Sequence, residues 1–186
     1  MRIAAAVFLV GFLLSGCQIT DDQLNQAIDL RKRILEAERC SFQSVITADY
    51  GEALYTFQMD CTVDSVGNLH FTVTDPESIS GITGEISQDS ALLTFDDKVL
   101  AFPVLADGQL TPVISPWLFI NTLRTGYLTG CSSNEEGLCI YIDDSYAEHP
   151  LRLEIYTDKN AAPVHADIIW QETRILTLDI REFTLQ

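Results

Sequence analysis

Residues 40–63 read CSFQSVITADYGEALYTFQMDCTV. Apolar and polar residues alternate on both sides of Tyr50 and Gly51, and this period of two is typical of half-buried strands. With Tyr50 and Gly51 as a two-residue turn, Asp49 lies opposite Glu52, and one face of the pair becomes mostly apolar. The stretch therefore predicts an antiparallel hairpin, and it indicates a fold that is mostly antiparallel β.

The same period recurs along the rest of the chain in about ten short segments, among them 69–73, 82–86, 151–155 and 176–180. Consecutive strands with short links are antiparallel, and clean alternation leaves one face of the sheet dry. A sheet of this size must curl. We therefore expect an α+β fold in which a strongly curved antiparallel sheet of about ten strands, a half-barrel, forms a single domain over residues 21–186.

Two segments show helical patterns instead. Residues 21–38 begin with two acids and carry basic residues toward their end, the signs that the helix dipole favours. A shorter helix is expected from Ser115 as N-cap to Arg124, with Pro116 in its first turn and Gly126 after its end. We expect both helices to cover the dry face of the sheet. The apolar stripe expected on the first helix consists of Leu24, Ala27, Ile28, Ile34 and Leu35.

The first seventeen residues have the form of an export signal. Residues 1–2 are a short cationic start, and residues 3–14 are an uncharged apolar run. That run is shorter than the ~20 residues that span a bilayer, and it has the ~7–15 residues of a secretory signal core. Leu14-Ser15-Gly16-Cys17 then resembles the bacterial lipobox at every position. The resemblance implies that a signal peptide of residues 1–16 is removed and that Cys17 carries diacylglyceryl and a further acyl chain such as palmitate. An ordinary signal peptide with a chance cysteine is the alternative.

Two or three acyl chains on one cysteine hold a protein on a membrane essentially permanently, whereas one chain is marginal. We therefore expect residues 17–20 to be a lipidated cysteine with a short tether, and the protein to be extracytoplasmic in the cell envelope. Gln18 is not the Asp that resembles an inner-membrane retention signal, so an outer-membrane address is allowed in a Gram-negative cell. In a Gram-positive cell the outer face of the cell membrane is expected. The sequence leaves the oligomeric state open.

Four cysteines remain after Cys17. An even number in an exported chain favours two disulfides, with free buried thiols as the alternative. The predicted hairpin register places Cys40 opposite Cys61, within disulfide reach. A link between Cys131 and Cys139 would close the polar loop between them. Cys-x-x-Cys does not occur, so a zinc site or a thioredoxin-type redox pair is not expected.

Charge and motif content argue against several classes of function. With 11 basic and 27 acidic residues, the formal net charge of −16 is unsuited to nucleic acid. His70 and His165 fall out of phase with the apolar positions, which favours a solvated face, and His149 lies in a loop with no partner in sequence. No nucleophile elbow, His-Glu-x-x-His, phosphate loop or EF-hand occurs. We expect no catalytic residue, metal or cofactor, and a small envelope hydrolase is the remaining enzyme alternative.

The order of elements over residues 21–186 resembles the LolA/LppX-like bacterial lipoprotein carriers. In that family a curved antiparallel sheet forms an incomplete barrel over a few helices, and the space between them holds acyl chains. The resemblance implies a non-catalytic protein that binds a lipid or a lipidated protein in an apolar cavity. LolA itself lacks a lipid anchor, so a chain with Cys17 is closer to the anchored LppX type. No functional residue of the family can be matched here.

The inward-facing positions also indicate a cavity, because the strands offer more apolar side chains than two helices can cover, and ligand cavities are mostly apolar. The alternative is that these side chains form a filled core, and that the protein is a structural or protein-interaction lipoprotein of the envelope without a ligand. The candidate lining residues are Phe57, Phe71, Ile86, Phe95, Trp117, Phe119, Leu153 and Trp170.

Overall fold

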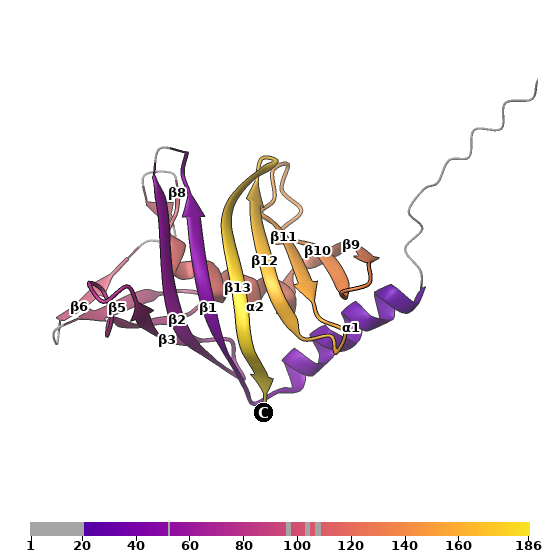
Figure 1. Ribbon diagram of the computed structural model, residues 1–186, viewed down its shortest axis with the longest axis horizontal. Coiled ribbons are helices and arrows are strands. Elements are labelled where there is room, and N and C mark those ends of the chain that lie inside the picture. Colours follow the sequence, from indigo (N-terminus) through magenta and orange to yellow (C-terminus); the bar gives the residue numbers. More distant parts are fainter. Residues whose placement is uncertain (1–20, 52, 96–97, 103–104, 107–108) are drawn as a thin grey trace, which may run out of the picture.

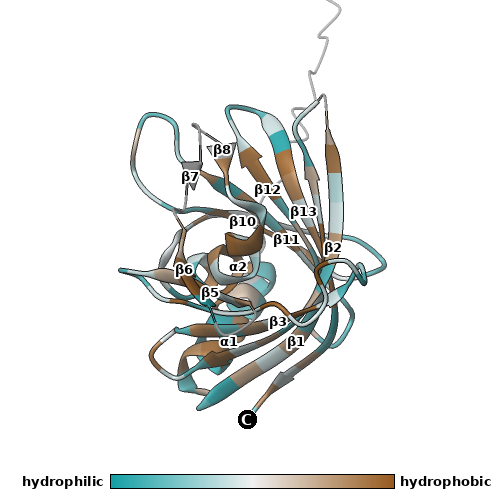
Figure 2. Ribbon diagram, turned by 90° about the vertical axis from the view of Figure 1, so that its left-hand side faces the viewer, coloured by the Kyte–Doolittle hydropathy of each residue, from teal (hydrophilic) through white to brown (hydrophobic). Residues whose placement is uncertain are grey.

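The computed structural model describes residues 21–186 apart from 52, 96–97, 103–104 and 107–108. The signal sequence and Cys17 lie outside the described residues. An eleven-stranded sheet runs in the order β6-β5-β4-β3-β2-β1-β13-β12-β11-β10-β9, with antiparallel pairing throughout. It curls around two helices without closing (Figures 1 and 2). The predicted half-barrel is therefore confirmed.

The helices are α1 (Asp21–Glu36) and α2 (Ser115–Thr125), and a short 3-10 turn covers Pro112–Ile114. A separate two-stranded hairpin is formed by β7 (Leu105–Ala106) and β8 (Gln109–Leu110). The strands of the large sheet are β1 (Arg39–Asp49), β2 (Leu54–Asp64), β3 (Leu69–Asp75), β4 (Thr83–Ile86), β5 (Ala91–Phe95), β6 (Lys98–Ala101), β9 (Tyr127–Ser133), β10 (Leu138–Asp143), β11 (Arg152–Thr157), β12 (Pro163–Trp170) and β13 (Thr173–Leu185).

The β1–β2 hairpin has the predicted faces but not the predicted register. Asp49 pairs with Leu54, and the Tyr50 amide donates to the Ala53 carbonyl, so the turn begins one residue later than predicted. Gly51 has φ +80°, a left-handed conformation that glycine adopts at little cost. The turn is therefore built around the residue that best tolerates its backbone geometry.

The shift in register moves the first pair of cysteines. Cys40 faces Val63 and Cys61 faces Phe42, so the predicted direct opposition of Cys40 and Cys61 is wrong. A shift of two residues leaves every side chain on its own face, which is why alternation alone could not detect it. Cys40 and Cys61 still share the buried inner face, and both are free thiols. A link between them stays a prediction.

The second pair of cysteines lies on the β9–β10 hairpin. Cys131 pairs with Ile140, and Cys139 pairs with Ser132. Because neighbouring residues of a strand point to opposite faces, the thiols of Cys131 and Cys139 point apart. Both are free in the structure, and a disulfide between them would require the hairpin to change register.

α2 fills the concave face of the sheet (Figure 2). It lies against β2, β10 and β13. The ring of Phe119 is fully buried and meets that of Phe42 edge-on, with centroids 5.7 Å apart. Leu118, Ile120 and Leu123 are also buried, so this short helix is covered on most sides and supplies the centre of the core.

The bounds of α2 agree with the prediction, but its cap does not. Ile114 occupies the N-cap position, because the 3-10 turn leads directly into the helix. The Ser115 hydroxyl instead donates to the Pro112 carbonyl at 2.7 Å. Gly126 ends the helix as predicted, and its amide donates to the Thr122 carbonyl.

α1 covers the edge strand β9 (Figure 1). Near its start, Gln23 donates to the Ser133 hydroxyl at 2.6 Å. Further along, the Arg31 guanidinium donates to the carbonyl oxygens of Leu123 at 2.7 Å and Gly126 at 2.8 Å. These contacts fix α1 antiparallel to β9.

The expected apolar stripe of α1 is only partly buried. Ala27 and Ile34 are buried, together with Leu30, which the sequence pattern did not assign to the stripe. Leu24, Ile28 and Leu35 are exposed, so the prediction that they face the sheet is wrong. The helix therefore presents two apolar faces, one against the core and one toward solvent.

Gly84 marks a close approach in β4. A Cβ atom added there would lie 2.3 Å from Cζ of Phe71 and 2.6 Å from the Leu92 carbonyl oxygen. We predict that Gly84→Ala lowers the free energy of unfolding by about 1–3 kcal/mol, because overpacking forces neighbours to shift. Urea denaturation measures this change. Thr83→Ala, at an exposed position of the same strand, is the control and should change stability by ~0.5 kcal/mol or less. Equal stability of the two variants would contradict the packing at Gly84.

Candidate functional site

The eight predicted lining residues differ in burial and fall into three groups. Trp117 is partly buried against the core. Phe95 is 47 % exposed and Trp170 is 41 % exposed, so neither belongs to the buried core. Side chains of α2 fill the space at the centre of the sheet, where the cavity was expected. Phe57, Phe71, Ile86, Phe119 and Leu153 are buried members of one continuous core.

The apolar inner face of the sheet continues beyond the cover of α2. Inward-facing residues form rows across β2 to β6, and burial declines along them. In the row that starts at Cys61, Phe71 is buried, Leu93 is half-buried and Leu100 on β6 is 63 % exposed. The edge of the sheet therefore leaves an apolar side chain open to solvent on the same face that forms the core.

The next inward-facing row repeats this decline. Val73 on β3 is buried, whereas Phe95 at the end of β5 is exposed. Phe95 pairs with Lys98 of β6, so a cationic side chain lies beside the exposed ring. We call Leu93, Phe95 and Leu100 the uncovered inner face of β5–β6. Among the described residues, it is an apolar surface with the positive charge of Lys98 at its end.

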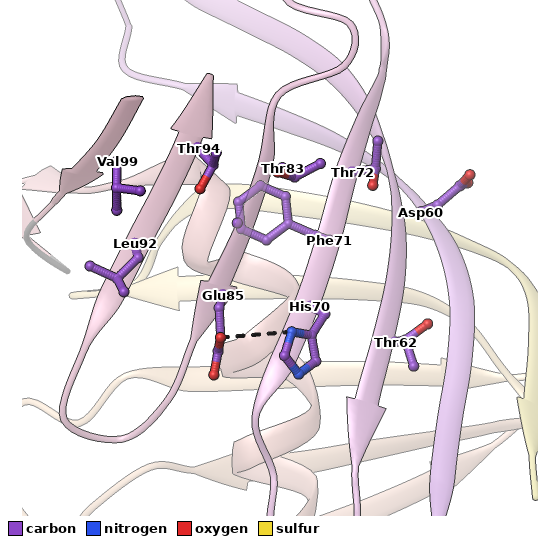
Figure 3. Close-up of a pocket in the computed structure, with 11 residues that line it drawn as sticks. Asp60, Thr62, His70, Phe71, Thr72, Thr83, Glu85, Leu92, Thr94 and Val99 are labelled. Atoms are coloured by element: carbon purple, nitrogen blue, oxygen red, sulfur yellow. Dashed lines mark ion pairs between the residues drawn. The ribbon is translucent and has the colours of Figure 1, made fainter. Parts of the chain in front are cut away.

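A hollow of about 540 Å³ lies on the opposite, outward face of the same strands (Figure 3). Thr72, Thr83 and Thr94 line one side of it, and His70 and Glu85 line another. Of the eight predicted lining residues, Phe71 is the one that contributes to this hollow. Leu92 and Val99 also line it, so its wall combines polar and apolar side chains.

His70 and Glu85 form an ion pair across the hollow. Nδ1 of His70 lies 3.9 Å from Oε2 of Glu85, and both side chains are about half exposed (54 % and 51 %). An exposed pair at this distance contributes little to stability. His70 therefore lies on a solvated face, as its place in the sequence pattern indicated.

A second hollow, of about 330 Å³, lies on the outward face of β9–β11. Cys139 lines it together with Ser132, Tyr141 and Tyr156. Burial raises the pKa of the Cys139 thiol, and burial likewise raises the pKa of Tyr156. Since the thiolate is the nucleophile, this cysteine is held in its less reactive form at neutral pH.

His165 is more strongly fixed than its place on the outward face suggested. Its Nδ1 lies 2.7 Å from the Asp179 carboxylate, and its Nε2 lies 3.2 Å from that of Asp167. Arg174 lies 3.6 Å from Asp167, and the ring of Tyr156 lies 5.5 Å from the imidazole. The hydrogen bond to Asp167, followed by that to Asp179, raises the pKa of His165. His165 therefore clamps β12 to β13 rather than standing free in solvent.

The raised pKa gives the His165 clamp a pH dependence. Its contribution is fully present below the unfolded pKa of ~6.5 and is lost as pH rises through the folded pKa. We predict that His165→Gln lowers the free energy of unfolding by about 1 kcal/mol at pH 6. The difference from the parent should shrink by pH 9. Urea denaturation at both pH values measures it, and a difference that grows with pH would contradict the assignment.

Two further findings concern other kinds of site. Among the residues that the structure describes, no group of three or more His, Cys, Asp or Glu side chains is placed to hold a metal ion. Within the same residues, no helix has both the length and the apolar character needed to cross a membrane. His149 is exposed in the loop before β11.

The sequence pattern did not identify the uncovered inner face as a group, although Phe95 was one of the predicted lining residues. Alternation placed Leu93 and Phe95 on one face of the sheet, but it carried no information about which strands the helices cover. Leu100 was not among the candidates at all. The shortness of the predicted central helix was the one available signal, since a helix of about three turns cannot cover so many strands.

Comparison with known proteins identifies structures of similar architecture. No family model and no curated protein matches the chain. A LolA superfamily protein from Nitrosomonas europaea is 10% identical, with a TM-score of 0.47 over 91% of this chain and 94% of that one. The Mycobacterium tuberculosis lipoprotein LppX is 13% identical, with a TM-score of 0.40 over 87% and 93%. LprF from Mycobacterium bovis is 10% identical, with a TM-score of 0.43 over 90% and 97%. All three TM-scores lie below 0.5, and the likeness is one of overall architecture.

Proposed function

We propose that this protein is a lipid-anchored protein of the bacterial cell envelope that holds an apolar chain, from a lipid or a lipidated protein, without catalysing a reaction. The supporting observation is the uncovered inner face of β5–β6, where Leu100 is 63 % exposed and Phe95 is 47 % exposed. Both side chains continue the inward-facing rows that form the core. The chain would lie along these rows as an extension of the core.

Burial of apolar surface supplies the binding energy. Each Å² of apolar area removed from water contributes about 25 cal/mol. Leu93, Phe95 and Leu100 come from two paired strands, so their positions are fixed before the ligand arrives. A surface ordered in advance loses little conformational entropy on binding. The uncovered face is therefore suited to a flexible chain of methylene groups.

Lys98 places a positive charge at one end of the proposed site, which would orient a bound lipid. It pairs with Phe95 at the end of the uncovered face, in a chain whose net charge is −16. Its ammonium group can meet the carboxylate or phosphate at the head of a lipid. A bound lipid would place its chain against Leu93 and Leu100 and its head toward Lys98.

Anchoring through Cys17 is part of the same proposal. It rests on the resemblance of residues 14–17 to a lipobox and on the apolar segment before it. Residues 18–20 separate Cys17 from α1, so the tether is short. The domain would therefore stay close to the membrane in which Cys17 is anchored.

A second candidate is a structural or protein-binding envelope lipoprotein without a ligand. The observation that favours it is the filled centre of the half-barrel, where Phe119 has no exposed surface. In that case the exposed residues of β5–β6 would meet a protein instead of a lipid. The two functions differ in whether the isolated domain binds an apolar chain.

Two adjacent residues of β6 provide a matched test. Val99 and Leu100 are both 63 % exposed but point to opposite faces of the sheet. We predict that Leu100→Asp weakens binding of an apolar fluorescent fatty acid to purified residues 21–186 at least tenfold. A charge in an apolar site is costly. Val99→Asp should change the affinity less than twofold. Fluorescence titration measures both.

The outcomes of this titration separate the two functions. Parent protein that binds no fatty acid would exclude the lipid-holding function and leave the protein-binding one. Equal loss in both variants would place the ligand elsewhere than the inner face. Circular dichroism of each variant confirms that the fold is kept.

The anchor has its own test. We predict that Cys17→Ser moves the protein from the membrane fraction to the soluble envelope fraction, because the acyl chains provide the attachment. Fractionation in high salt, followed by detection of the protein in each fraction, measures this. Retention of the Cys17→Ser variant on membranes in high salt would contradict lipid anchoring. Gln18→Asn is the control and should stay with the membrane.

A further inference from the structure

The exposed side of α1 carries an apolar stripe. Leu24 is 36 % exposed, Ile28 49 % and Leu35 48 %. At 3.6 residues per turn, these three side chains lie within about 40° of one another around the helix axis. The buried residues Ala27 and Ile34 are centred about 90° away from them. We call Leu24, Ile28 and Leu35 the outer stripe of α1, because it does not serve the core.

The outer stripe is held in a fixed orientation. Arg31 donates to two backbone carbonyl oxygens at the end of α2 and before β9, and Gln23 donates to Ser133 at the other end of β9. The helix cannot turn the stripe inward without breaking these bonds. Whatever covers the stripe must therefore come from outside the domain.

Two exposed tyrosines, Tyr127 and Tyr146, lie at the end of the sheet where Arg31 of α1 binds Gly126. Tyr127 follows Gly126, whose carbonyl oxygen accepts from Arg31. Its ring lies 3.6 Å, centroid to centroid, from that of Tyr146, which is 84 % exposed. Tyrosine rings with a polar tip are typical of the level of lipid headgroups. The aromatic pair extends the apolar character of this end beyond the helix.

The charge distribution also sets α1 apart. α1 contains three basic and four acidic residues, whereas residues 37–186 contain seven and twenty-three. An anionic membrane surface repels negative charge. α1 is therefore a part of this acidic protein that can approach such a surface with little repulsion.

The short segment between Cys17 and α1 limits how far α1 can lie from the membrane. Cys17 precedes Asp21 by four residues, and a fully extended chain spans at most ~3.6 Å per residue. If Cys17 carries the lipid, as the proposed function holds, α1 begins within about 14 Å of the bilayer. A helix face this close to an anchor meets a high effective concentration of membrane.

We propose that α1 lies along the membrane surface, with the outer stripe buried at the boundary between headgroups and acyl chains. This inference rests on the anchoring part of the proposed function. It gives the protein an orientation, because β5 and β6 lie at the far end of the molecule from α1 (Figure 1). The uncovered inner face would then be held away from the bilayer and open to a carrier or partner.

Quenching by brominated lipid tests the depth of α1. Full-length acylated protein, purified from membranes, is placed in vesicles of phosphatidylcholine with or without bromine on the acyl chains. Ile28→Trp adds a fluorophore to the outer stripe, and Gln26→Trp adds one to an exposed position about 160° away on the same helix. The fluorescence of the parent, with Trp117 and Trp170, is subtracted from each.

We expect brominated lipid to quench the added fluorescence of Ile28→Trp by about half and that of Gln26→Trp by less than a tenth. Adding Leu24→Ser and Leu35→Ser to Ile28→Trp should at least halve the quenching. Absent or equal quenching in the two single variants overturns the inference. Emission from Ile28→Trp that shifts to the blue only as protein density rises also overturns it, in favour of a second copy of the chain.

Flotation of the same vesicles separates this inference from the proposal beneath it. Protein that fails to float shows that the anchor is absent, which overturns this inference together with the anchoring part of the proposed function. Protein that floats without quenching shows that the anchor holds while α1 stands clear of the bilayer. The inference about α1 then fails alone.

Discussion

The pairing of β1 with β13 holds the architecture together. Strands from the two ends of the domain meet there over most of their length, from Cys40 opposite Leu185 to Ala48 opposite Leu176. This contact joins β2–β6 to β9–β12 as one continuous sheet. Without it the chain would have two smaller sheets and no common concave face. The packing of α2 and the uncovered edge both depend on this junction.

A mismatch of size explains the uncovered edge. α2 has 11 residues and is about 16 Å long, whereas eleven strands at about 4.8 Å spacing extend over roughly 50 Å along the curve. One such helix can cover the centre, where Phe119 meets Phe42, and α1 covers the β9 edge. Among the residues that the structure describes, none covers the β5–β6 edge in this way, and Leu93, Phe95 and Leu100 become progressively exposed. The exposed apolar surface therefore arises because the helices are too short to cover the whole width of the sheet.

The fold class could be predicted because it depends on local patterns. The alternation in β1 and β2 identified their faces, and Pro116 and Gly126 marked the ends of α2. The register could not be predicted from alternation, because shifting by two residues preserves both faces and only the conformation of Gly51 distinguishes the turns. The sequence pattern also placed Leu24 and Ala27 in one stripe of α1, because both are apolar. Only the position of β9 shows that Ala27 faces the core and Leu24 faces solvent.

The candidate site was harder to predict than the fold, because it depends on contacts between residues that are far apart in the sequence. Phe95 was recognised as inward-facing, and Phe119 was recognised as apolar, yet one is exposed and the other has no exposed surface. Their difference arises from long-range packing of α2, which the sequence pattern does not carry. His165 was expected in solvent because its partners, Asp167 and Asp179, come together only when β12 pairs with β13.

We propose that the apolar chain of the ligand lies on the inner face of β5–β6. Photo-cross-linking tests it most directly: residues 21–186 are mixed with a fatty acid that carries a diazirine near the end of its chain, irradiated, and digested for mass spectrometry. We expect the adducts to fall on peptides that contain Leu93, Phe95 or Leu100. Adducts confined to the outward hollow near Thr83, to α1, or to no specific peptide would contradict it.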